Sequence, residues 1–181
     1  CAGGGKCTIT YNVGEKEAID LCNEINSKNL LCETEFYNSS QRTKFIYKKK
    51  FNQVYYFATP KILSSNKSKF DEKLYRSFKR VYVTDFKYVC TQVQKYNPKC
   101  KIFSPSTNFI DNQINNFNEY IKAKKELEKV SLKLINKRNL IIINPRLPRF
   151  DTDQNQSIMS YKFQDPIKIL ISYIKKMNTK N

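Results

Sequence analysis

Strand-like and helix-like segments alternate along this chain of 181 residues, and that order constrains the fold more than any other feature. Runs rich in β-branched and aromatic residues predict strands, and the expected strands are 6–12, 30–36, 51–58, 100–104 and 139–144. Apolar residues at helical spacing predict helices between them, over 15–28, 70–96, 116–136 and 165–177. Such an order is typical of an α/β fold, in which a doubly wound parallel sheet carries helices on both faces.

The chain carries a formal charge of +17, from 33 Lys and Arg against 16 Asp and Glu. An excess of this size suggests nucleic-acid binding, but the basic residues are spread along the sequence, which favours a generally basic surface instead. The one dense cluster, "KFIYKKKF" at 44–51, is interpreted as a basic loop before a strand that could hold a phosphate-bearing ligand. No run of about 18 apolar residues occurs, so we expect neither a nucleic-acid partner nor a membrane partner.

The absence of histidine excludes hydrolases built on Ser-His-Asp or Cys-His sites, together with most zinc enzymes. Acid–base chemistry in this chain must therefore use Tyr, Lys, Asp, Glu or Cys. Six cysteines occur without a C-x-x-C spacing, at Cys1, Cys7, Cys22, Cys32, Cys90 and Cys100. We expect them to be small buried residues in a reducing cytoplasm, without a metal ion.

Residues that follow the expected strands are the candidates for function, because doubly wound sheets bind ligands beyond the carboxyl ends of their strands. These residues are Asn12, Tyr37 and Asn38, Ala58 to Pro60, Ser104 to Asn108, and Pro145 to Arg149. The polar segment 151–160 is long enough to act as a mobile loop over a site.

One lysine is separated from the others on the helix expected over 116–136. With Tyr120 at 0° on a helical wheel, Lys124 falls at about +40°, at the edge of the apolar stripe, whereas the helix's other lysines face solvent. A Tyr-x-x-x-Lys pair alone usually means a ring on the core rim with a lysine extending past it. Here Ser106 and Thr107 directly follow the preceding strand, so hydroxyl, phenol and ammonium groups are expected at one crevice.

Together these segments resemble the short-chain dehydrogenase/reductase superfamily, and the resemblance covers nearly the whole chain. "YIKAKKELE" supplies a Tyr-x-x-x-Lys motif, "IFSPST" resembles the strand that carries the catalytic Ser or Thr, and "VYYFATP" resembles the fourth strand. "CTITYNVGEKEAIDLCNEI" resembles the second strand with its helix, and "INPRLPRFDTDQ" stands where the family has Pro-Gly and a Thr that contacts the cofactor. Within the superfamily, "FATP" and "SPST" are most similar to ketoreductase-type domains that work beside acyl carrier proteins.

The resemblance implies one Rossmann-like domain over 1–181, which uses NADP or NAD to reduce a ketone or a β-ketoacyl thioester. It makes Tyr120 the proton donor and Lys124 the group that lowers the tyrosine pKa and binds the cofactor ribose. Ser106 or Thr107 would hold the substrate carbonyl, and the sequence leaves the choice between them open. The residues expected to contact the cofactor are Asn12, Asn38, Ala58, Thr59, Lys124 and Pro145.

The sequence departs from the family pattern at three places. The Gly-rich turn that cradles the cofactor pyrophosphate is absent, because "AGGGK" precedes an expected strand rather than a helix. We therefore expect an N-terminally incomplete fold, without the family's first strand and helix. Tyr82 or Val83 stands where the family has an Asn that relays protons, and Pro145 is followed by Arg146 rather than by Gly.

These departures support a second hypothesis, in which the chain is a catalytically degenerate Rossmann-like domain that acts through protein contacts within a larger assembly. Under either hypothesis we expect a cytoplasmic protein. For the reductase, the expected partners are a small-molecule or carrier-bound carbonyl substrate and an acyl carrier protein. A homodimer through the helices at 70–96 and 116–136 is expected from the resemblance alone.

Overall fold

The computed structural model describes residues 1, 4–38, 41, 45–60, 62, 70–112, 116–138, 140–148, 150 and 165–178. The chain divides into two compact units, Cys1–Lys49 and Lys50–Asn181, and each is described by itself. The expectation that 1–181 forms one domain stays a prediction. The mobile loop expected at 151–160 lies outside the described residues.

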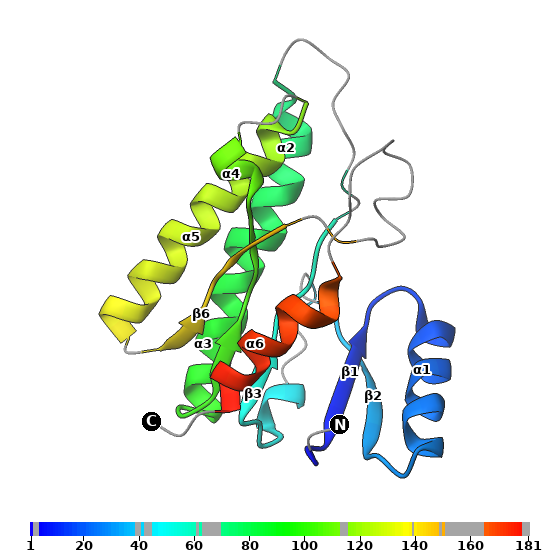
Figure 1. Ribbon diagram of the computed structural model, residues 1–181. Coiled ribbons are helices and arrows are strands. Elements are labelled where there is room, and N and C mark those ends of the chain that lie inside the picture. The colour runs from blue at the N-terminus through cyan, green and yellow to red at the C-terminus, as the bar shows by residue number, and fades with distance from the viewer. Residues whose placement is uncertain are drawn as a thin grey trace. The chain divides into compact units, whose positions relative to one another are not determined.

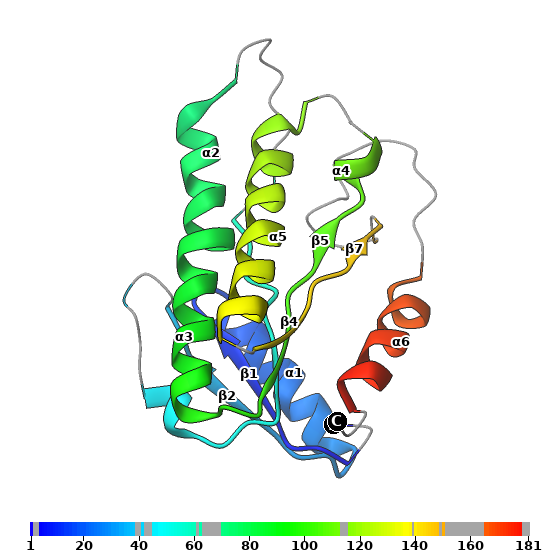
Figure 2. The ribbon, with the colours of Figure 1, turned by 90° about the vertical axis from the view of Figure 1, so that its left-hand side faces the viewer.

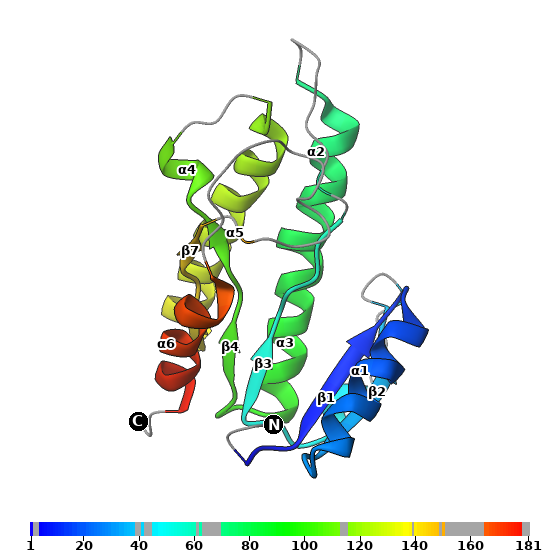
Figure 3. The ribbon, with the colours of Figure 1, turned by 45° about the vertical axis from the view of Figure 1, so that its right-hand side comes forward.

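The first unit is a strand–helix–strand motif, made of β1 (Cys7–Tyr11), α1 (Glu15–Ser27) and β2 (Cys32–Phe36). The two strands pair in parallel, and α1 lies along one face of them (Figure 3). Gly14 precedes the helix with a φ of 79°, a left-handed conformation that glycine adopts without strain. This turn lets the chain leave β1 and enter α1 at once.

The basic segment 44–51 differs from its expected loop structure. A 3-10 turn, η1 (Phe45–Lys48), occupies its centre. Lys49 Nζ lies 3.0 Å from Glu33 Oε1 and also binds the Glu35 carboxylate. Part of the positive charge of this cluster is therefore neutralised by β2, which weakens the interpretation of the segment as a phosphate site.

The second unit contains the remaining elements. Its strands are β3 (Gln53–Tyr55), β4 (Lys101–Phe103), β5 (Ser106–Thr107), β6 (Ile141–Ile143) and β7 (Arg146–Leu147). Its helical segments are α2 (Glu72–Lys79), the π-helical turn η2 (Arg80–Asp85), α3 (Phe86–Tyr96), α4 (Phe109–Asn112), α5 (Asn118–Arg138) and α6 (Pro166–Asn178). Strands β3, β4 and β6 form a parallel sheet in that order, and β5 pairs in parallel with β7. The expected α/β architecture with parallel strands is confirmed.

Helices cover both faces of the β3-β4-β6 sheet (Figures 1 and 2). On one face lie α3 and α5, whose buried residues include Phe86 and Leu127, each at most 1% exposed. On the other face α6 packs through Met177 against Phe103 and Leu147. Each large apolar side chain that is fully buried stabilises the fold by roughly 1.5–3 kcal/mol, so the ends of β4 and β6 are firmly held.

The neighbouring strands β4 and β6 are each interrupted by a proline, and their pairing then resumes. Pro105 follows β4 and Pro145 follows β6, and neither residue has a backbone N–H for the sheet. The pairing continues beyond them, because the Ser106 N–H donates to the Pro145 carbonyl at 2.7 Å and the Asn108 N–H donates to the Leu147 carbonyl at 3.0 Å. The β5-β7 pair, which the sequence pattern did not predict, therefore extends the strands toward one end of the unit.

The long helix expected over 70–96 is continuous but changes its winding in the middle (Figure 2). Asp71 caps α2, because its carboxylate accepts two backbone N–H groups at 2.9 and 3.0 Å. At the end of η2 the Phe86 N–H donates to the carbonyl of Val81, five residues earlier. Such π-turns are rare within helices and frequently lie at functional sites.

Candidate active site

A cavity of about 230 Å³ lies at the carboxyl ends of the strands in the second unit. Its wall is formed by residues after β3, by the segment from the end of β4 through β5, by the end of β7, and by η2 and α5. Polar side chains at this wall include Thr59, Tyr82, Ser104, Ser106, Thr107, Tyr120 and Lys124. The position is the one at which doubly wound sheets bind their ligands.

Lys124 is buried in the cavity wall, deeper than the edge position that the helical wheel predicts, and is only 7% exposed. Its ammonium donates a hydrogen bond to the Pro105 carbonyl at 2.8 Å and lies 3.9 Å from the centroid of the Tyr82 ring. Burial lowers the pKa of Lys124 to about 7, and the Glu128 carboxylate opposes part of that shift. At neutral pH the side chain is therefore near the midpoint of its titration.

Tyr120 lies one helical turn before Lys124 and lines the same cavity. Its half-buried ring meets Phe78, Tyr82 and Phe109 edge-on, with centroid separations of 5.6, 5.9 and 6.1 Å. The Lys124 ammonium is 5.7 Å from the centroid of the Tyr120 ring. Aromatic neighbours from three elements hold this ring in place, so the phenol has a defined position beside the ammonium.

Two hydroxyl groups of β5, from Ser106 and Thr107, are buried beside the cavity. Thr107 Oγ1 accepts the backbone N–H of Phe109 at 3.3 Å, a bond that leaves the threonine's own proton unused. Ser106 Oγ makes no direct hydrogen bond among the described residues. Arg146 and, to a smaller extent, Ser106 lower the pKa of Glu128, so the serine hydroxyl lies near that carboxylate. Both hydroxyls can donate to an added oxygen atom.

Tyr82 is one of the two residues expected where the family has a proton-relaying Asn. Its ring is 2% exposed, stacks on Phe78 at a centroid distance of 6.0 Å, and its hydroxyl shares a hydrogen bond with Thr59. Burial raises the pKa of Tyr82, so the side chain is a neutral phenol. The sequence pattern did not predict that the Tyr82 ring lies against the Lys124 ammonium. The π-turn that positions this ring leaves no clear signal in the spacing of the apolar residues.

The residues predicted to contact the cofactor fall into two groups. Ala58 and Thr59 line the cavity together with Lys124, and the Pro145 carbonyl binds β5 without lining the cavity. Asn12 and Asn38 belong to the first unit, and their role in cofactor binding stays a prediction.

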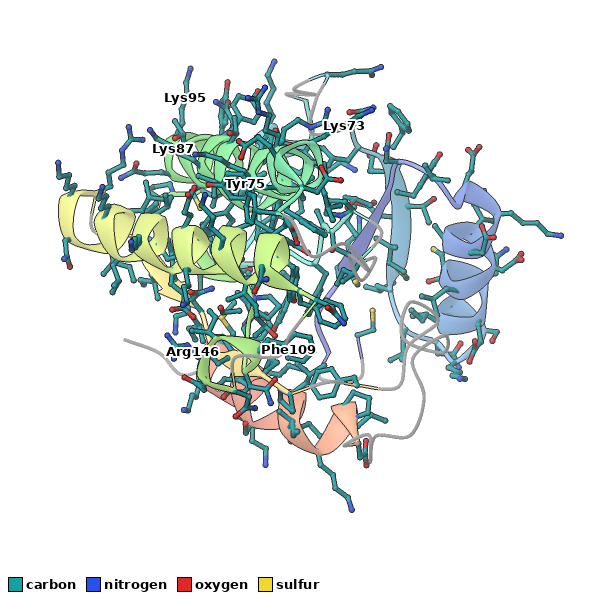
Figure 4. The ribbon with its side chains drawn as sticks, turned by 90° about the horizontal axis from the view of Figure 1, so that it is seen from above. Lys73, Tyr75, Lys87, Lys95, Phe109 and Arg146 are labelled. Atoms are coloured by element: carbon teal, nitrogen blue, oxygen red, sulfur yellow. The ribbon has the colours of Figure 1, made fainter. Side chains whose placement is uncertain are left out.

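Arg146, the residue that replaces the family's Gly, supports the cavity from outside. Its guanidinium binds both oxygens of Glu128 on α5, at 2.9 and 2.7 Å, and also pairs with Asp111 of α4. It is not among the residues that line the cavity, and Figure 4 places it close to Phe109. The substitution therefore links β7 to two helices rather than filling the candidate site.

Basic side chains project from the outer faces of the helices. Lys87 and Lys95 point from the side of α3 that faces away from α5 (Figure 4). Tyr75, in contrast, lies between α2 and α5, where its hydroxyl donates to Glu126. Within the part of the chain that the structure describes, no helix has both the length and the apolar character needed to cross a lipid bilayer.

Comparison of the sequence with protein-family models and with curated proteins finds no match. Many solved structures are nevertheless similar in fold. A short-chain dehydrogenase from Escherichia coli CFT073, crystallised with NADPH, has 12% identity and a TM-score of 0.78, over 94% of this chain and 79% of that chain. Acetoin dehydrogenase from Enterobacter cloacae has 13% identity and a TM-score of 0.71, over 98% of this chain and 82% of that chain.

A third structure, FolM alternative dihydrofolate reductase 1 from Brucella suis in complex with NADP, has 13% identity and a TM-score of 0.71. The match covers 91% of this chain and 68% of that chain. Identities this low establish the arrangement of the backbone and not the chemistry of the site. The likeness extends over nearly the whole chain and agrees with the motifs of the sequence, so the chain has the Rossmann-like fold of the short-chain dehydrogenases and reductases.

Proposed function

We propose that the chain is an NAD(P)H-dependent oxidoreductase that reduces a ketone or a β-ketoacyl thioester. The observation that carries this proposal is the meeting of Tyr120, Lys124 and the two hydroxyl residues of β5 at one cavity beyond the strand ends. A phenol, a buried amine and a hydroxyl donor are the groups that protonation of a carbonyl oxygen requires.

The residues of the cavity suit a nicotinamide dinucleotide. Lys124 provides a buried amine, and the cavity-lining Ser106 Oγ is a buried polar atom without a direct hydrogen-bond partner among the described residues. Buried atoms of this kind are expected to find a partner in a ligand or in water. The Escherichia coli and Brucella suis proteins were crystallised with NADPH and NADP, which, with the basic surface of this chain, favours NADP over NAD.

Bound cofactor would supply the hydride to the carbonyl carbon, and Tyr120 supplies the proton to the carbonyl oxygen. A free tyrosine has a pKa near ~10, too high for efficient proton transfer at neutral pH. An ammonium within about 4–6 Å of the phenol oxygen stabilises the phenolate and lowers that pKa, and the Lys124 ammonium lies 5.7 Å from the centroid of the Tyr120 ring. The hydroxyl of Ser106 or Thr107 donates to the same carbonyl oxygen and fixes it beside Tyr120.

The size of the cavity limits what it can enclose. Its volume of about 230 Å³ lies below the ~300–1,000 Å³ of most small-molecule sites. We therefore assign it to the reacting ends of cofactor and substrate, with the remainder of both molecules outside. The apolar side chains of Phe109 and Phe117 at the wall would exclude water from the reacting atoms.

The resemblance also supports four broader proposals. Residues 1–181 act as one Rossmann-like domain in the cytoplasm, the substrate is free or bound to an acyl carrier protein, and two chains pair through α2, α3 and α5. Gel filtration with light scattering tests the dimer, and comparison of free with carrier-bound thioesters tests the carrier.

One observation favours a second candidate function. The Lys124 ammonium is already engaged by the Pro105 carbonyl and the Tyr82 ring, and Tyr82 is one of the two residues expected in place of the family's Asn. A site closed in this way is consistent with a catalytically degenerate domain that contributes protein contacts to a larger assembly. Such a domain would bind neither NADPH nor NADH.

The experiment that tests the reductase uses the full chain, NADPH or NADH, and an acetoacetyl thioester. We expect calorimetry to show cofactor binding and absorbance to show cofactor oxidation. Tyr120→Phe removes the transferred proton, so turnover should fall by a factor of roughly 10²–10⁴ while cofactor binding persists. The matched control is Tyr55→Phe. The wild-type Tyr55 hydroxyl binds Gln53 on the same strand, outside this cavity, so the turnover of this variant should be unchanged.

Two outcomes would contradict the proposal. If neither cofactor binds at millimolar concentration, the chain is not a reductase and the second candidate is favoured. If Tyr120→Phe keeps full turnover, the tyrosine is not the proton donor. Separate Ser106→Ala and Thr107→Val variants decide which hydroxyl holds the carbonyl, because only one of them should raise KM and lower kcat together.

A further inference from the structure

Three cysteine sulfurs gather at one end of the first unit, far in sequence from the candidate active site. Cys1, Cys7 and Cys32 each offer an Sγ atom, and the three atoms lie within 4.8 Å of one another. Among the residues that the structure describes, no other three side chains with metal-binding groups come together in this way. The proposed reductase chemistry uses none of them.

The backbone explains why these three sulfurs meet. Cys7 and Cys32 are direct partners in the parallel β1-β2 pair, so their side chains leave the same face of the sheet. The Gly4 N–H donates to the Cys1 carbonyl at 2.8 Å, and Gly4 has a φ of +82°. The Cys1 thiol in turn donates to the Leu31 carbonyl at 3.3 Å, which holds Cys1 beside the start of β2.

The separations suit a single cation that prefers sulfur. Zn–S bonds of about 2.3 Å in a tetrahedron place neighbouring sulfurs about 3.8 Å apart. Since the three sulfurs are already within 4.8 Å of one another, each pair needs to approach by no more than about 1 Å. Small rotations of the half-buried Cys1, Cys7 and Cys32 side chains achieve this without moving the strands.

Asn26 of α1 fixes the position of Cys32. Its Oδ1 accepts the Cys32 N–H at 2.8 Å, and its Nδ2 donates to the Cys32 carbonyl at 3.0 Å. The same Nδ2 lies 3.6 Å from the Cys22 sulfur. Polar groups that hold a ligand residue in this way are a recurrent part of metal sites, so the backbone of Cys32 is held in place before any ion binds.

The first unit also has little else to stabilise it. Among the described residues, its buried apolar side chains are Ala18, Cys22 and Tyr47. Units of about 50 residues are marginal on the basis of their core alone, and many gain stability from disulfides or metal ions. An ion between the three sulfurs would tie the chain before β1 to the starts of both strands.

We propose that Cys1, Cys7 and Cys32 bind one Zn²⁺ ion through their thiolates, with water or an outside ligand in the fourth position. Sulfur donors select Zn²⁺ or Cu⁺ over hard cations such as Mg²⁺. Each thiol releases its proton to water as the ion binds. The sequence predicted no metal because it lacks C-x-x-C, whereas these ligands lie 6 and 25 positions apart (7 − 1 and 32 − 7).

The test uses the full chain, reduced and freed of metal, and titrates it first with Co²⁺ and then with Zn²⁺. We expect one Co²⁺ per chain with the charge-transfer absorption of thiolate ligands, its loss on addition of Zn²⁺, and a higher unfolding temperature with Zn²⁺. Cys7→Ala and Cys32→Ala should abolish the absorption. Cys90→Ala and Cys100→Ala, at buried cysteines of the second unit, should keep it.

A second measurement needs no variant and so does not depend on whether the variants fold. Alkylation of the wild-type chain, read by mass spectrometry, should slow at Cys1, Cys7 and Cys32 when Zn²⁺ is present. Absence of both protection and charge-transfer absorption would overturn the proposal, as would a disulfide among the three cysteines that persists under reducing conditions. Cys22→Ala should still bind Co²⁺, and loss of binding there would overturn the three-sulfur ligand set.

Discussion

The Lys124 ammonium lies 3.9 Å from the centroid of the Tyr82 ring, inside a wall where both side chains are at least nine-tenths buried. An aromatic face attracts a cation, and the attraction is worth about 2 kcal/mol or more when both groups are removed from water. The same burial disfavours the charge, and it lowers the pKa of Lys124 to about 7. The two effects oppose each other at a residue that the proposed reaction needs in its charged form.

The stability of the chain should depend on pH through Lys124. The unfolded chain keeps this lysine protonated up to its usual pKa near 10.5, whereas the folded chain keeps it protonated only up to about 7. Between these values the unfolded state binds more protons, so stability rises with pH, by about 1.4 kcal/mol for each unit of pKa difference.

Urea unfolding of the wild type and of Lys124→Met between pH 6 and 9 measures this effect. The wild type should gain several kcal/mol relative to the variant across that range. Parallel stability curves for the two proteins would show that Lys124 titrates normally in the folded chain. Lys125→Met, at an exposed position of the same helix, serves as the control and should follow the wild type.

A double-mutant cycle should isolate the contact between Lys124 and Tyr82. Tyr82→Leu is made in the wild type and in Lys124→Met, and the four unfolding free energies are compared. At pH 6 we expect a coupling energy of about 1–2 kcal/mol, because the cation loses its aromatic partner. At pH 9 the lysine is neutral, so the coupling should vanish; a coupling that does not change with pH would indicate packing alone.

Cofactor affinity should fall as the pH rises through about 7, because the neutral form of Lys124 cannot bind the cofactor as an ammonium. NADH is the better ligand for this measurement, since the 2′-phosphate of NADPH has its own pKa near ~6. Calorimetry at pH 6 and 8 should show tighter binding at the lower pH in the wild type. Lys124→Met should bind more weakly and equally at both values; a wild type without pH dependence would contradict this role.

Arg146→Gly should destabilise β7 without changing the residues that line the candidate site. The variant loses the paired hydrogen bonds to Glu128 and the contact with Asp111, which at a partly exposed position stabilise by up to about 1 kcal/mol. Arg146 lowers the pKa of Glu128, so this contribution is present at neutral pH and is lost as pH falls through the lowered pKa. Denaturation at a series of pH values should show a difference at pH 7 that shrinks as the pH falls below 4.5, with NADPH affinity unchanged.

Local patterns were sufficient to predict the order of the main strands and helices and the placement of Tyr120 and Lys124 on one helix. Both depend on helical or strand spacing within about ten residues, which the sequence displays directly. The helix that carries the pair is found at Asn118–Arg138, close to the expected 116–136. The lysine is buried rather than at the edge, because the aromatic residues of neighbouring elements close over it.

Contacts between distant segments could not be predicted in this way. The β5-β7 pair depends on two prolines 40 positions apart (145 − 105) that interrupt neighbouring strands together. The cysteine cluster depends on the register of Cys7 with Cys32, and the sequence alone does not give that register. The ring of Tyr82 reaches the lysine only because a π-turn lies between α2 and α3.

The number of residues in that π-turn sets the position of Tyr82. A π-turn holds one residue more than an α-helical path between the same ends. Deletion of Val83 would therefore let α2 and α3 join as one regular helix, with the residues on either side still in register. The placement of the Tyr82 ring over the Lys124 ammonium thus depends on one additional residue in the helix backbone rather than on any residue of the cavity itself.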